Sequence, residues 1–506
     1  MFIYGNDHLT LTKVMAIARG KMRAGISKDV ATRLQQSRLS VVQMAAGPSA
    51  IYGINTGFGP LCDTRISPED THLLQKNLLL THAVGVGRPV NLMIARLMLI
   101  GKIHALCQGY SGIRLTVIER MLYFLEHDLI PLVPEQGSVG ASGDLAPLSH
   151  LFLPLIGEGE LWVNGAFHPA ASVLAQHELQ PLQLQAKEGL ALINGTQFIL
   201  AHAVIGLDRM RYLLDVADVV GTMSLEGFQG SAAPFRVELH ELRPFRGGQI
   251  VAQRIRRMLA GSQNISAHAN CARVQDPYSI RCMPQVHGAS RNAWQHLREL
   301  TEIELNAVTD NPIILNDHEA ISGGNFHGQP LAMALDYTTV AAAELGNISD
   351  RRCYLLLEGK YGLPRLLTKH GGLNSGYMIP QYTTAALVTE NKTLCFPASA
   401  DSIPTSLGQE DHVSMGSISG RKLNQVLTNL EKILAIELMY AAQAMEFRRP
   451  NTFSDFIEAK LVQVRQQVPH LAEDRLLKDD IQRLIELLET RSIDVTVKLQ
   501  TEEATP

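Results

Sequence analysis

A glycine-rich stretch, GSVGASGDLAPLSH at Gly137–His150, holds the most distinctive set of residues in the chain. Its glycines allow positive φ and a close approach of the backbone, while Asp144 and Pro147 are typical of the start of a helix. An Ala-Ser-Gly triplet is expected by chance roughly 0.2 times in a chain of ordinary composition and this length. The triplet alone therefore indicates a tight loop, and its chemistry depends on the motifs that accompany it.

Further polar motifs interrupt the apolar segments on both sides of this loop. They are IYGINTGFG at 51–59, THAVGVG at 81–87, EGLALINGTQ at 188–197, VQDPYSIRCMPQ at 274–285, TDNPI at 309–313, SGGNFHGQP at 322–330 and TSLGQEDHVSM at 405–415. With the loop, they resemble the aromatic amino acid ammonia-lyase and aminomutase family. The resemblance extends along nearly the whole chain.

The resemblance implies a cofactor made from the chain itself. In that family an Ala-Ser-Gly tripeptide cyclises to 4-methylideneimidazol-5-one (MIO), here from Ala141, Ser142 and Gly143. The Gly143 amide would attack the Ala141 carbonyl, a fold that only glycine allows without a Cβ clash. Loss of water closes the ring, and loss of the Ser142 hydroxyl as a second water leaves an electrophilic methylene. We expect an intact mass two waters below that of the sequence, with no metal and no external cofactor.

The resemblance also assigns catalytic roles to two tyrosines. Tyr52, in the glycine-rich loop 51–59, would transfer the proton from the β-carbon, and Tyr278 would orient and stabilise the reacting groups. A phenol is normally protonated at neutral pH, so service as a base demands a lowered pKa. We expect Tyr52 to be the base.

Six residues are expected to bind the substrate. They are His82, Asn194, Gln275, Arg281, Phe326 and Glu410. The planar guanidinium of Arg281 can bind both oxygens of a carboxylate at once. Asn194 lies in the apolar segment Gly189–Leu207, where a buried amide needs a hydrogen-bond partner. The resemblance places Phe326 in the pocket wall and gives TDNPI a supporting role for neighbouring loops.

Glu410 indicates which amino acid is bound. Histidine-specific members of the family carry glutamate at this position, where phenylalanine and tyrosine enzymes usually carry glutamine. A carboxylate can pair with a nitrogen of the substrate's imidazole, and the resemblance places His82 near the same ring. Beside a phenyl ring, the carboxylate would be an unpaired buried charge, which costs several kcal/mol. The resemblance thus implies non-oxidative deamination of L-histidine to urocanate and ammonia, a reaction of histidine catabolism.

Three alternatives stay open at this point. The chain could be a tyrosine or phenylalanine ammonia-lyase, or an aminomutase of the same family. A zinc enzyme has little support, because no HExxH occurs and His268 to Cys271 is a solitary HxxC. A non-catalytic helical assembly protein would give no reason for so many loops rich in Gly, Asn and Tyr.

Composition excludes several other classes of protein. The 506 residues are 46% hydrophobic and 19% charged, with a net charge of -4, which argues against disordered chains and against nucleic acid or acidic membranes as partners. Six scattered cysteines with no CxxC pair suit reduced thiols in the cytoplasm. The first residues lack the order of a signal peptide. Gly189–Leu207 is too polar to span a membrane and is expected to be a buried helix.

Apolar residues at three-and-four spacing predict long helices at 90–127, 198–226, 290–308, 331–358 and 423–446. Strand-like runs are short, such as 160–163 and 313–315. We therefore expect a mainly α fold, a long-helix bundle with a loop-rich N-terminal part that carries small β pieces. A soft boundary divides residues 1–200, which hold the cofactor and tyrosine loops, from the helical residues 201–506. By the resemblance, the protein is a homotetramer whose sites are shared between subunits.

Overall fold

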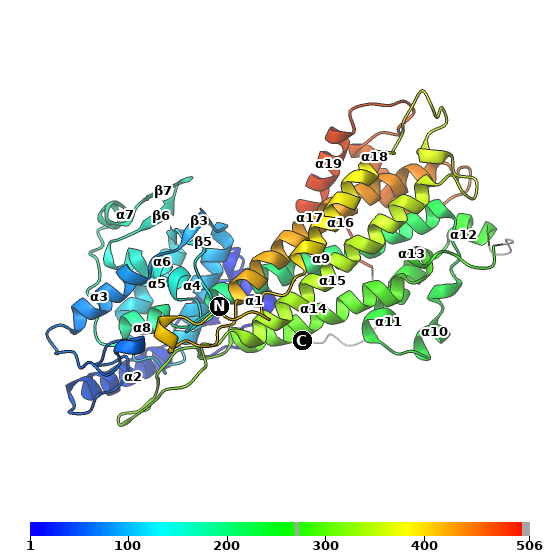
Figure 1. Cartoon of the computed structure of the whole chain (residues 1–506). Coiled ribbons are helices and arrows are strands. Elements are labelled where there is room, and N and C mark those ends of the chain that lie inside the picture. The colour runs from blue at the N-terminus through cyan, green and yellow to red at the C-terminus, as the bar shows by residue number, and fades with distance from the viewer. Residues whose placement is uncertain (269–272, 498–506) are drawn as a thin grey trace. The chain divides into compact units, whose positions relative to one another are not determined.

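Helices form most of this protein in a computed structural model that describes residues 1–268 and 273–497 (Figure 1). The longest are α9 (Gln197–Phe228), α14 (Met283–Leu305), α15 (Gln329–Leu357) and α17 (Gly416–Glu446). The shorter helices are α1 (Leu11–Ala18), α2 (Lys28–Ala46), α3 (Thr71–His82), α4 (Leu92–Leu106), α5 (Leu115–Glu126), α6 (Leu145–Phe152), α7 (Ala170–Gln176), α8 (Glu188–Ile193), α10 (Val237–Glu241), α11 (Arg246–Met258), α12 (Gln263–Ala267), α13 (Tyr278–Arg281), α16 (Pro380–Leu394), α18 (Asp455–Gln467) and α19 (Leu477–Glu489).

The β structure consists of small separate sheets. A parallel pair joins β1 (Phe2–Ile3) to β2 (Ala24–Gly25), and antiparallel pairs join β3 (Val86–Pro89) to β5 (Pro134–Gln136) and β8 (Ile313–Asn316) to β9 (Glu319–Ile321). An antiparallel sheet contains β4 (Ile130–Pro131), β6 (Glu160–Val163) and β7 (Ala166–Pro169). The predicted mainly α fold with small β pieces is confirmed.

Two predicted helices are each interrupted by glycine. The pattern at 90–127 forms two helices, because α4 ends at Leu106 and the chain turns through Gly109 and Gly112, both at positive φ. The buried helix expected at Gly189–Leu207 is also wrong, since α8 stops at Ile193 and α9 starts at Gln197. Gly195, at φ +135°, lies in the break. A glycine can hold such a conformation without steric cost.

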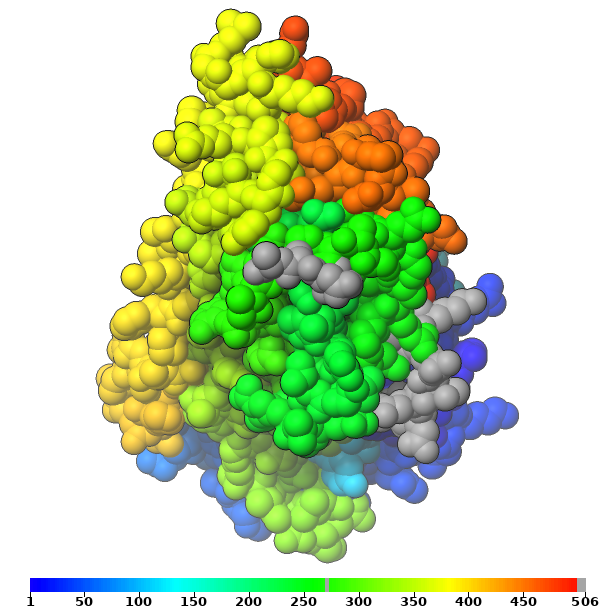
Figure 2. Space-filling view, turned by 90° about the vertical axis from the view of Figure 1, so that its right-hand side faces the viewer, coloured from blue at the N-terminus to red at the C-terminus, as the bar shows by residue number. Residues whose placement is uncertain are grey.

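The chain folds into two compact units, each assembled from segments distant in sequence. Unit 1 contains residues 1–205, 297–335 and 397–421, and unit 2 contains residues 206–296, 336–396 and 422–506. The predicted division at residue 200 lies close to residue 205, where the chain first passes from unit 1 to unit 2. The prediction did not include the segments 297–335 and 397–421, which also belong to unit 1. The predicted domain division stays untested. In Figure 2 the green segments of unit 2, which include α10–α13, lie beside yellow and orange segments of the same unit.

The core of unit 2 contains the apolar face of α17. Its expected members are all fully buried: Leu423, Val426, Leu427, Leu430, Ile433, Leu434 and Leu438. Burying a face of this kind is the main source of stability for a long amphipathic helix.

Two further properties concern the described part of the chain as a whole. None of its helices combines the length and the apolar character that crossing a membrane requires. Five cysteines, Cys62, Cys107, Cys282, Cys353 and Cys395, are free thiols, while Cys271 lies outside the described residues. Location in the cytoplasm stays a prediction.

Candidate active site

The Ala-Ser-Gly tripeptide lies in unit 1, between β5 and α6, in a tightly bent backbone. Ser142 and Gly143 are both in the left-handed region, at φ +51° and +76°. A Cβ built on Gly143 would lie 2.1 Å from the Gly195 carbonyl oxygen, so no other residue fits there. Ala141 is buried and packs against Val413 and Met415. The loop is thus a strained turn with no room for a side chain at its third position.

The break between α8 and α9 clamps this turn from the other side. The Gly195 amide donates to the Ser142 carbonyl at 3.3 Å, and the Asp144 amide donates to the Gly195 carbonyl at 2.7 Å. Within the described residues, these hydrogen bonds leave the Gly143 amide and the Ala141 carbonyl unengaged. The two groups that ring closure would join are therefore free to react.

Asp144 connects the loop to the start of α9. Its carboxylate accepts the backbone amides of Phe198 and Ile199, both at 3.0 Å, and the Ser138 hydroxyl at 2.9 Å. Burial raises the pKa of Asp144 to about 7, against the lowering effect of these three donors. The helix start predicted at Asp144 is observed, and the same side chain also caps the first turn of α9.

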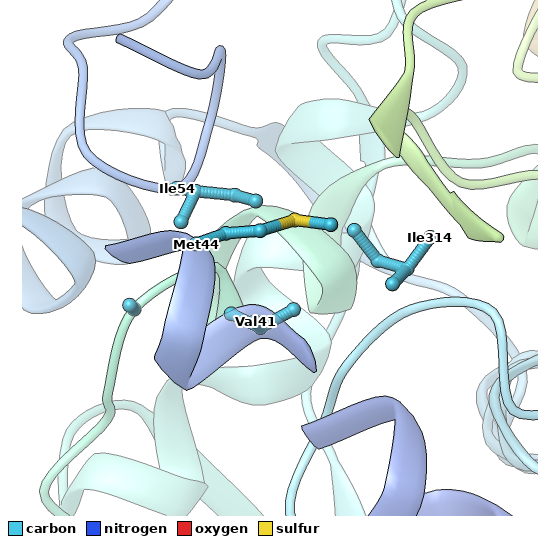
Figure 3. Close-up of a cluster of buried hydrophobic side chains, with 5 residues drawn as sticks. Val41, Met44, Ile54 and Ile314 are labelled. Atoms are coloured by element: carbon cyan, nitrogen blue, oxygen red, sulfur yellow. The ribbon is translucent and has the colours of Figure 1, made fainter. Parts of the chain in front are cut away.

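The tyrosine loop 51–59 is anchored by Ile54, which is fully buried. Ile54 packs with Val41 and Met44 of α2 and with Ile314 of β8 (Figure 3). Two residues earlier, the Tyr52 hydroxyl accepts the Gly59 amide at 3.5 Å. The loop is therefore fixed at its apolar residue while the phenol stays half-buried at the pocket.

A cavity of about 540 Å³ in unit 1 brings five of the predicted residues together: Tyr52, His82, Ser142, Asn194 and Glu410. A smaller adjoining cavity of about 240 Å³ reaches Ala141 and Gly143 and shares His82 and Glu410 with the first. A cavity of this size, lined by apolar side chains and a few polar groups, is typical of a small-molecule site.

The Glu410 carboxylate is hydrogen-bonded both to the tripeptide and to the start of its own segment, Thr405 and Ser406. One carboxylate oxygen accepts the Ser142 hydroxyl at 3.1 Å. The other accepts the hydroxyls of Thr405 at 2.9 Å and Ser406 at 2.8 Å. These donors hold the carboxylate in one orientation at the cavity wall, where it can accept a hydrogen bond from a ligand.

His82 and Tyr52 are both shifted towards their neutral forms. Burial lowers the pKa of His82, partly offset by the Leu78 backbone and by Glu410. Burial also raises the pKa of Tyr52; the Gly59 amide lowers it, and Glu410 and Cys62 raise it further. The field expected to make Tyr52 a base is therefore not produced by unit 1 itself, and the phenol is protonated at neutral pH.

Asn194 is 3% exposed, and its side-chain oxygen has no hydrogen-bond partner among the described residues. An unpaired buried amide oxygen costs free energy unless a ligand or water engages it. The position of Asn194 in the cavity wall agrees with a ligand-binding role.

The second tyrosine motif forms its own group in unit 2. The Arg281 guanidinium donates to the Gln275 side-chain oxygen at 2.9 Å and lies 4.7 Å from the centre of the Tyr278 ring. Tyr278 is 71% exposed. Arg352 is buried and paired with Glu437, and it donates a hydrogen bond to the Ser279 carbonyl of α13 at 3.4 Å.

Phe326 is half-buried in the loop before α15 and does not line either unit 1 cavity. TDNPI does support neighbouring segments: Thr309 accepts the Gln197 amide at 2.9 Å, and Asp310 pairs with Lys187 at 2.5 Å. In the part of the chain that the structure describes, no three of His, Cys, Asp and Glu are arranged to hold a metal ion.

Other residues at the site were not found by the sequence patterns. Thr405 and Ser406 orient Glu410, and Phe58 packs edge-on against Tyr52 at 6.5 Å between ring centres. Lys102 lies behind Asn194 and is buried. The sequence indicates this residue as the single lysine in the apolar run LMLIGKIHAL, because a lysine is almost never fully buried unless it is paired.

Comparison with known proteins identifies the class to which this fold and site belong. Residues 9–466 match the aromatic amino acid lyase family, so the chain belongs to that family. It is 47% identical over 497 residues to the histidine ammonia-lyase of Myxococcus xanthus, covering 98% of each chain.

Solved structures agree on the fold. The histidine ammonia-lyase of Trypanosoma cruzi is 41% identical with a TM-score of 0.87, over 97% of this chain and 93% of that one. A tyrosine aminomutase of Streptomyces globisporus is 34% identical with a TM-score of 0.92, over 99% and 100%. The predicted family and enzyme class, a carbon–nitrogen lyase, are confirmed, and the predicted histidine ammonia-lyase reaction agrees with the curated relatives.

Proposed function

We propose that this enzyme eliminates ammonia from L-histidine to give urocanate. The observation that carries the proposal is the Glu410 carboxylate, which Thr405 and Ser406 hold at the wall of the cavity that also contains Ser142 and His82. A carboxylate there can pair with an imidazole N–H, whereas a phenyl or phenol ring would leave it without a cationic or N–H partner. The name shared by the curated relatives supports the same substrate.

The tripeptide fits the ring expected of the family. Consecutive left-handed residues, no space for a Cβ on Gly143, and an unengaged Gly143 amide and Ala141 carbonyl are the features that cyclisation requires. Once formed, the MIO group supplies an electron-poor methylene carbon that makes the substrate's amine a better leaving group. Gly195 and Asp144 would hold its backbone through the hydrogen bonds already described.

The side chains around the cavity would bind and orient histidine. Glu410 accepts one imidazole N–H, and His82, kept neutral by burial, can hydrogen-bond to the other side of the ring. Asn194 lines the cavity and would bind a polar group of the substrate with its side-chain amide, whose oxygen has no partner among the described residues. These contacts fix the substrate in one orientation before any proton moves.

Tyr52 is proposed as the group that accepts the β-proton. Since unit 1 raises its pKa, the phenolate must be favoured by charge that arrives with the substrate or with another part of the assembled site. Arg281 is a suitable cation, and we propose that it binds the substrate's carboxylate, with Gln275 and Tyr278 beside it. Phe326 stays a proposed wall residue.

We also propose a homotetramer with sites shared between subunits. On the unit 2 part of α15, exposed residues recur at alternating spacings of four and three positions: Tyr337, Val340, Glu344, Asn347, Arg351 and Tyr354. Tyr337, Val340 and Tyr354 are 54%, 48% and 52% exposed. Such a stripe is the seam by which one helix packs on another, and exposed Tyr278 is available to a neighbouring subunit.

One assay separates this proposal from its alternative. The purified protein is incubated with L-histidine, L-tyrosine or L-phenylalanine, and the conjugated product is followed by ultraviolet absorbance. We expect product from histidine alone. The tyrosine reaction is also separated by chromatography, because a β-amino acid lacks the conjugated double bond. Its formation instead would identify an aminomutase, the activity named for one structural neighbour.

A further inference from the structure

Lys102 is a fully buried cation that the proposed reaction does not use. It is 1% exposed on α4, and burial lowers the pKa of its ammonium group to about 7. No carboxylate in the described chain lies within ion-pair distance of its nitrogen, since nearby Asp310 is paired with Lys187. A buried lysine without an ion pair is costly, so its position needs a specific reason.

The one hydrogen bond of the Lys102 ammonium group points to that reason. It donates to the backbone carbonyl of Asn194, the residue that ends α8. The final carbonyls of a helix lack partners within the helix, and a cation there satisfies one of them and interacts favourably with the helix dipole. Lys102 therefore caps α8 at the point where the chain turns towards the tripeptide.

The turn that Lys102 contacts adjoins both the cavity and the tripeptide. Asn194 lines the cavity, and its side-chain oxygen is buried without a hydrogen-bond partner among the described residues. The next residue, Gly195, donates to the Ser142 carbonyl and accepts the Asp144 amide, so it clamps the tripeptide on both sides. A Cβ built on the neighbouring Gly101 would lie 3.6 Å from the side chains of Gln197 and Leu200, so α4 approaches the first turn of α9 closely at this point.

We propose that Lys102 is a positioning residue for ring closure. By fixing the Asn194 carbonyl, it holds Gly195 in place. The hydrogen bonds of Gly195 to Ser142 and Asp144 then bring the Gly143 amide onto the Ala141 carbonyl. The inference rests on the proposed function, because it concerns formation of the ring. In that step the Gly143 nitrogen bonds to the Ala141 carbonyl carbon, and two waters leave, one carrying the carbonyl oxygen and one the Ser142 hydroxyl.

Loss of the Lys102 donor should slow ring closure more than it affects folding. A displacement of about 1 Å between reacting groups costs about 100-fold in rate. Lys102→Met keeps the length of the side chain and removes the buried charge, so the fold itself is expected to persist. We expect the half-time for loss of the two waters to lengthen by roughly tenfold or more.

The test follows the intact mass of freshly expressed protein over time, with circular dichroism as the check on folding. Lys460→Met is the matched control, since Lys460 is also buried but lies in unit 2, and it should lose both waters at the parent rate. A merely structural role would change the melting temperature of Lys102→Met without leaving chains at the uncyclised mass.

Each outcome has a distinct meaning. If the parent protein retains the full mass of its sequence, the proposed function itself is wrong. If the parent is two waters lighter and folded Lys102→Met reaches that mass equally fast, only the role of Lys102 is wrong. Should Lys102→Met fail to fold, Lys102→Gln, which keeps an N–H donor with less reach, is compared in the same way and judged by the same two results.

Discussion

The Ser142 hydroxyl donates a hydrogen bond to the Glu410 carboxylate at 3.1 Å, across 268 positions of sequence. The residue proposed to lose its hydroxyl when the ring forms thus touches the residue proposed to select the substrate. Thr405 and Ser406 occupy the second oxygen of the carboxylate, so Glu410 faces the cavity in a fixed orientation. In the uncyclised chain, hydrogen bonds therefore connect the Ala-Ser-Gly loop, Glu410 and the segment that begins at Thr405.

Glu410→Gln should weaken the reaction with histidine and leave the ring intact. Glutamine can still accept the Ser142 hydroxyl, but it loses the charged partner for the imidazole, worth about 1.5–3 kcal/mol. We expect kcat/KM for histidine to fall by about 10- to 100-fold while the mass deficit of two waters persists. Unchanged kinetics with histidine would mean that Glu410 does not contact the substrate.

Ser142→Ala should abolish both the mass deficit and turnover. Alanine has no hydroxyl to lose as the second water, so the exocyclic methylene cannot form. Intact-mass spectrometry and the histidine assay check the two effects on the same sample. A variant that still turned over histidine at the parent rate would exclude the tripeptide as the source of the electrophile.

Tyr52→Phe should lower kcat by about 10²- to 10⁴-fold, the usual contribution of a positioned general base. The substitution removes only the phenol oxygen, and Ile54 still anchors the loop in its apolar cluster, so KM should change little. Steady-state kinetics with histidine measure both constants. Loss of affinity without loss of kcat would transfer the proton-accepting role to another group.

Lys102 should make the free energy of unfolding rise as the pH increases from neutral to alkaline values. Burial lowers its pKa from 10.5 to about 7 in the folded chain; Asp310 raises it and Lys187 lowers it further. Between these values the unfolded chain binds the extra proton, so the free energy of unfolding rises with pH, by at most about 1.4 kcal/mol per unit.

Urea unfolding at several pH values between about 7 and 10 measures this slope. The difference between the parent protein and Lys102→Met isolates the contribution of one group. Equal slopes for the two proteins would show that the Lys102 pKa is not lowered.

Val340→Asp should dissociate the proposed tetramer. A carboxylate in the middle of the α15 stripe would be buried without a partner, which costs several kcal/mol in a packed interface. Light scattering should report a smaller particle, and histidine turnover should fall with the lost fraction of tetramer. Val462→Asp, the same change at an exposed position of α18, should keep size and activity. A fully active Val340→Asp tetramer would place the interface elsewhere.

Local features of the fold could be predicted because they depend on neighbouring residues. The apolar spacing of Leu423 to Leu438 specifies the buried face of α17, and the glycines of 137–143 specify a tight turn. The predictions failed where a glycine overrides apolar periodicity. A hydrophobic pattern does not reveal that Gly195 adopts φ +135° and ends a helix that the neighbouring residues favour.

The sequence by itself determined the family of this protein and indicated the chemistry proposed for it. The tripeptide that can cyclise, the tyrosine, the arginine and the glutamate are all readable as residue types in order. Only the tertiary structure decided that Tyr52, His82, Ser142, Asn194 and Glu410 line one cavity and that a buried lysine supports the turn beside them. The physical reason is that residue types and short-range spacing fix backbone conformation and amphipathic faces, whereas contacts across hundreds of positions arise from the packing of the whole unit.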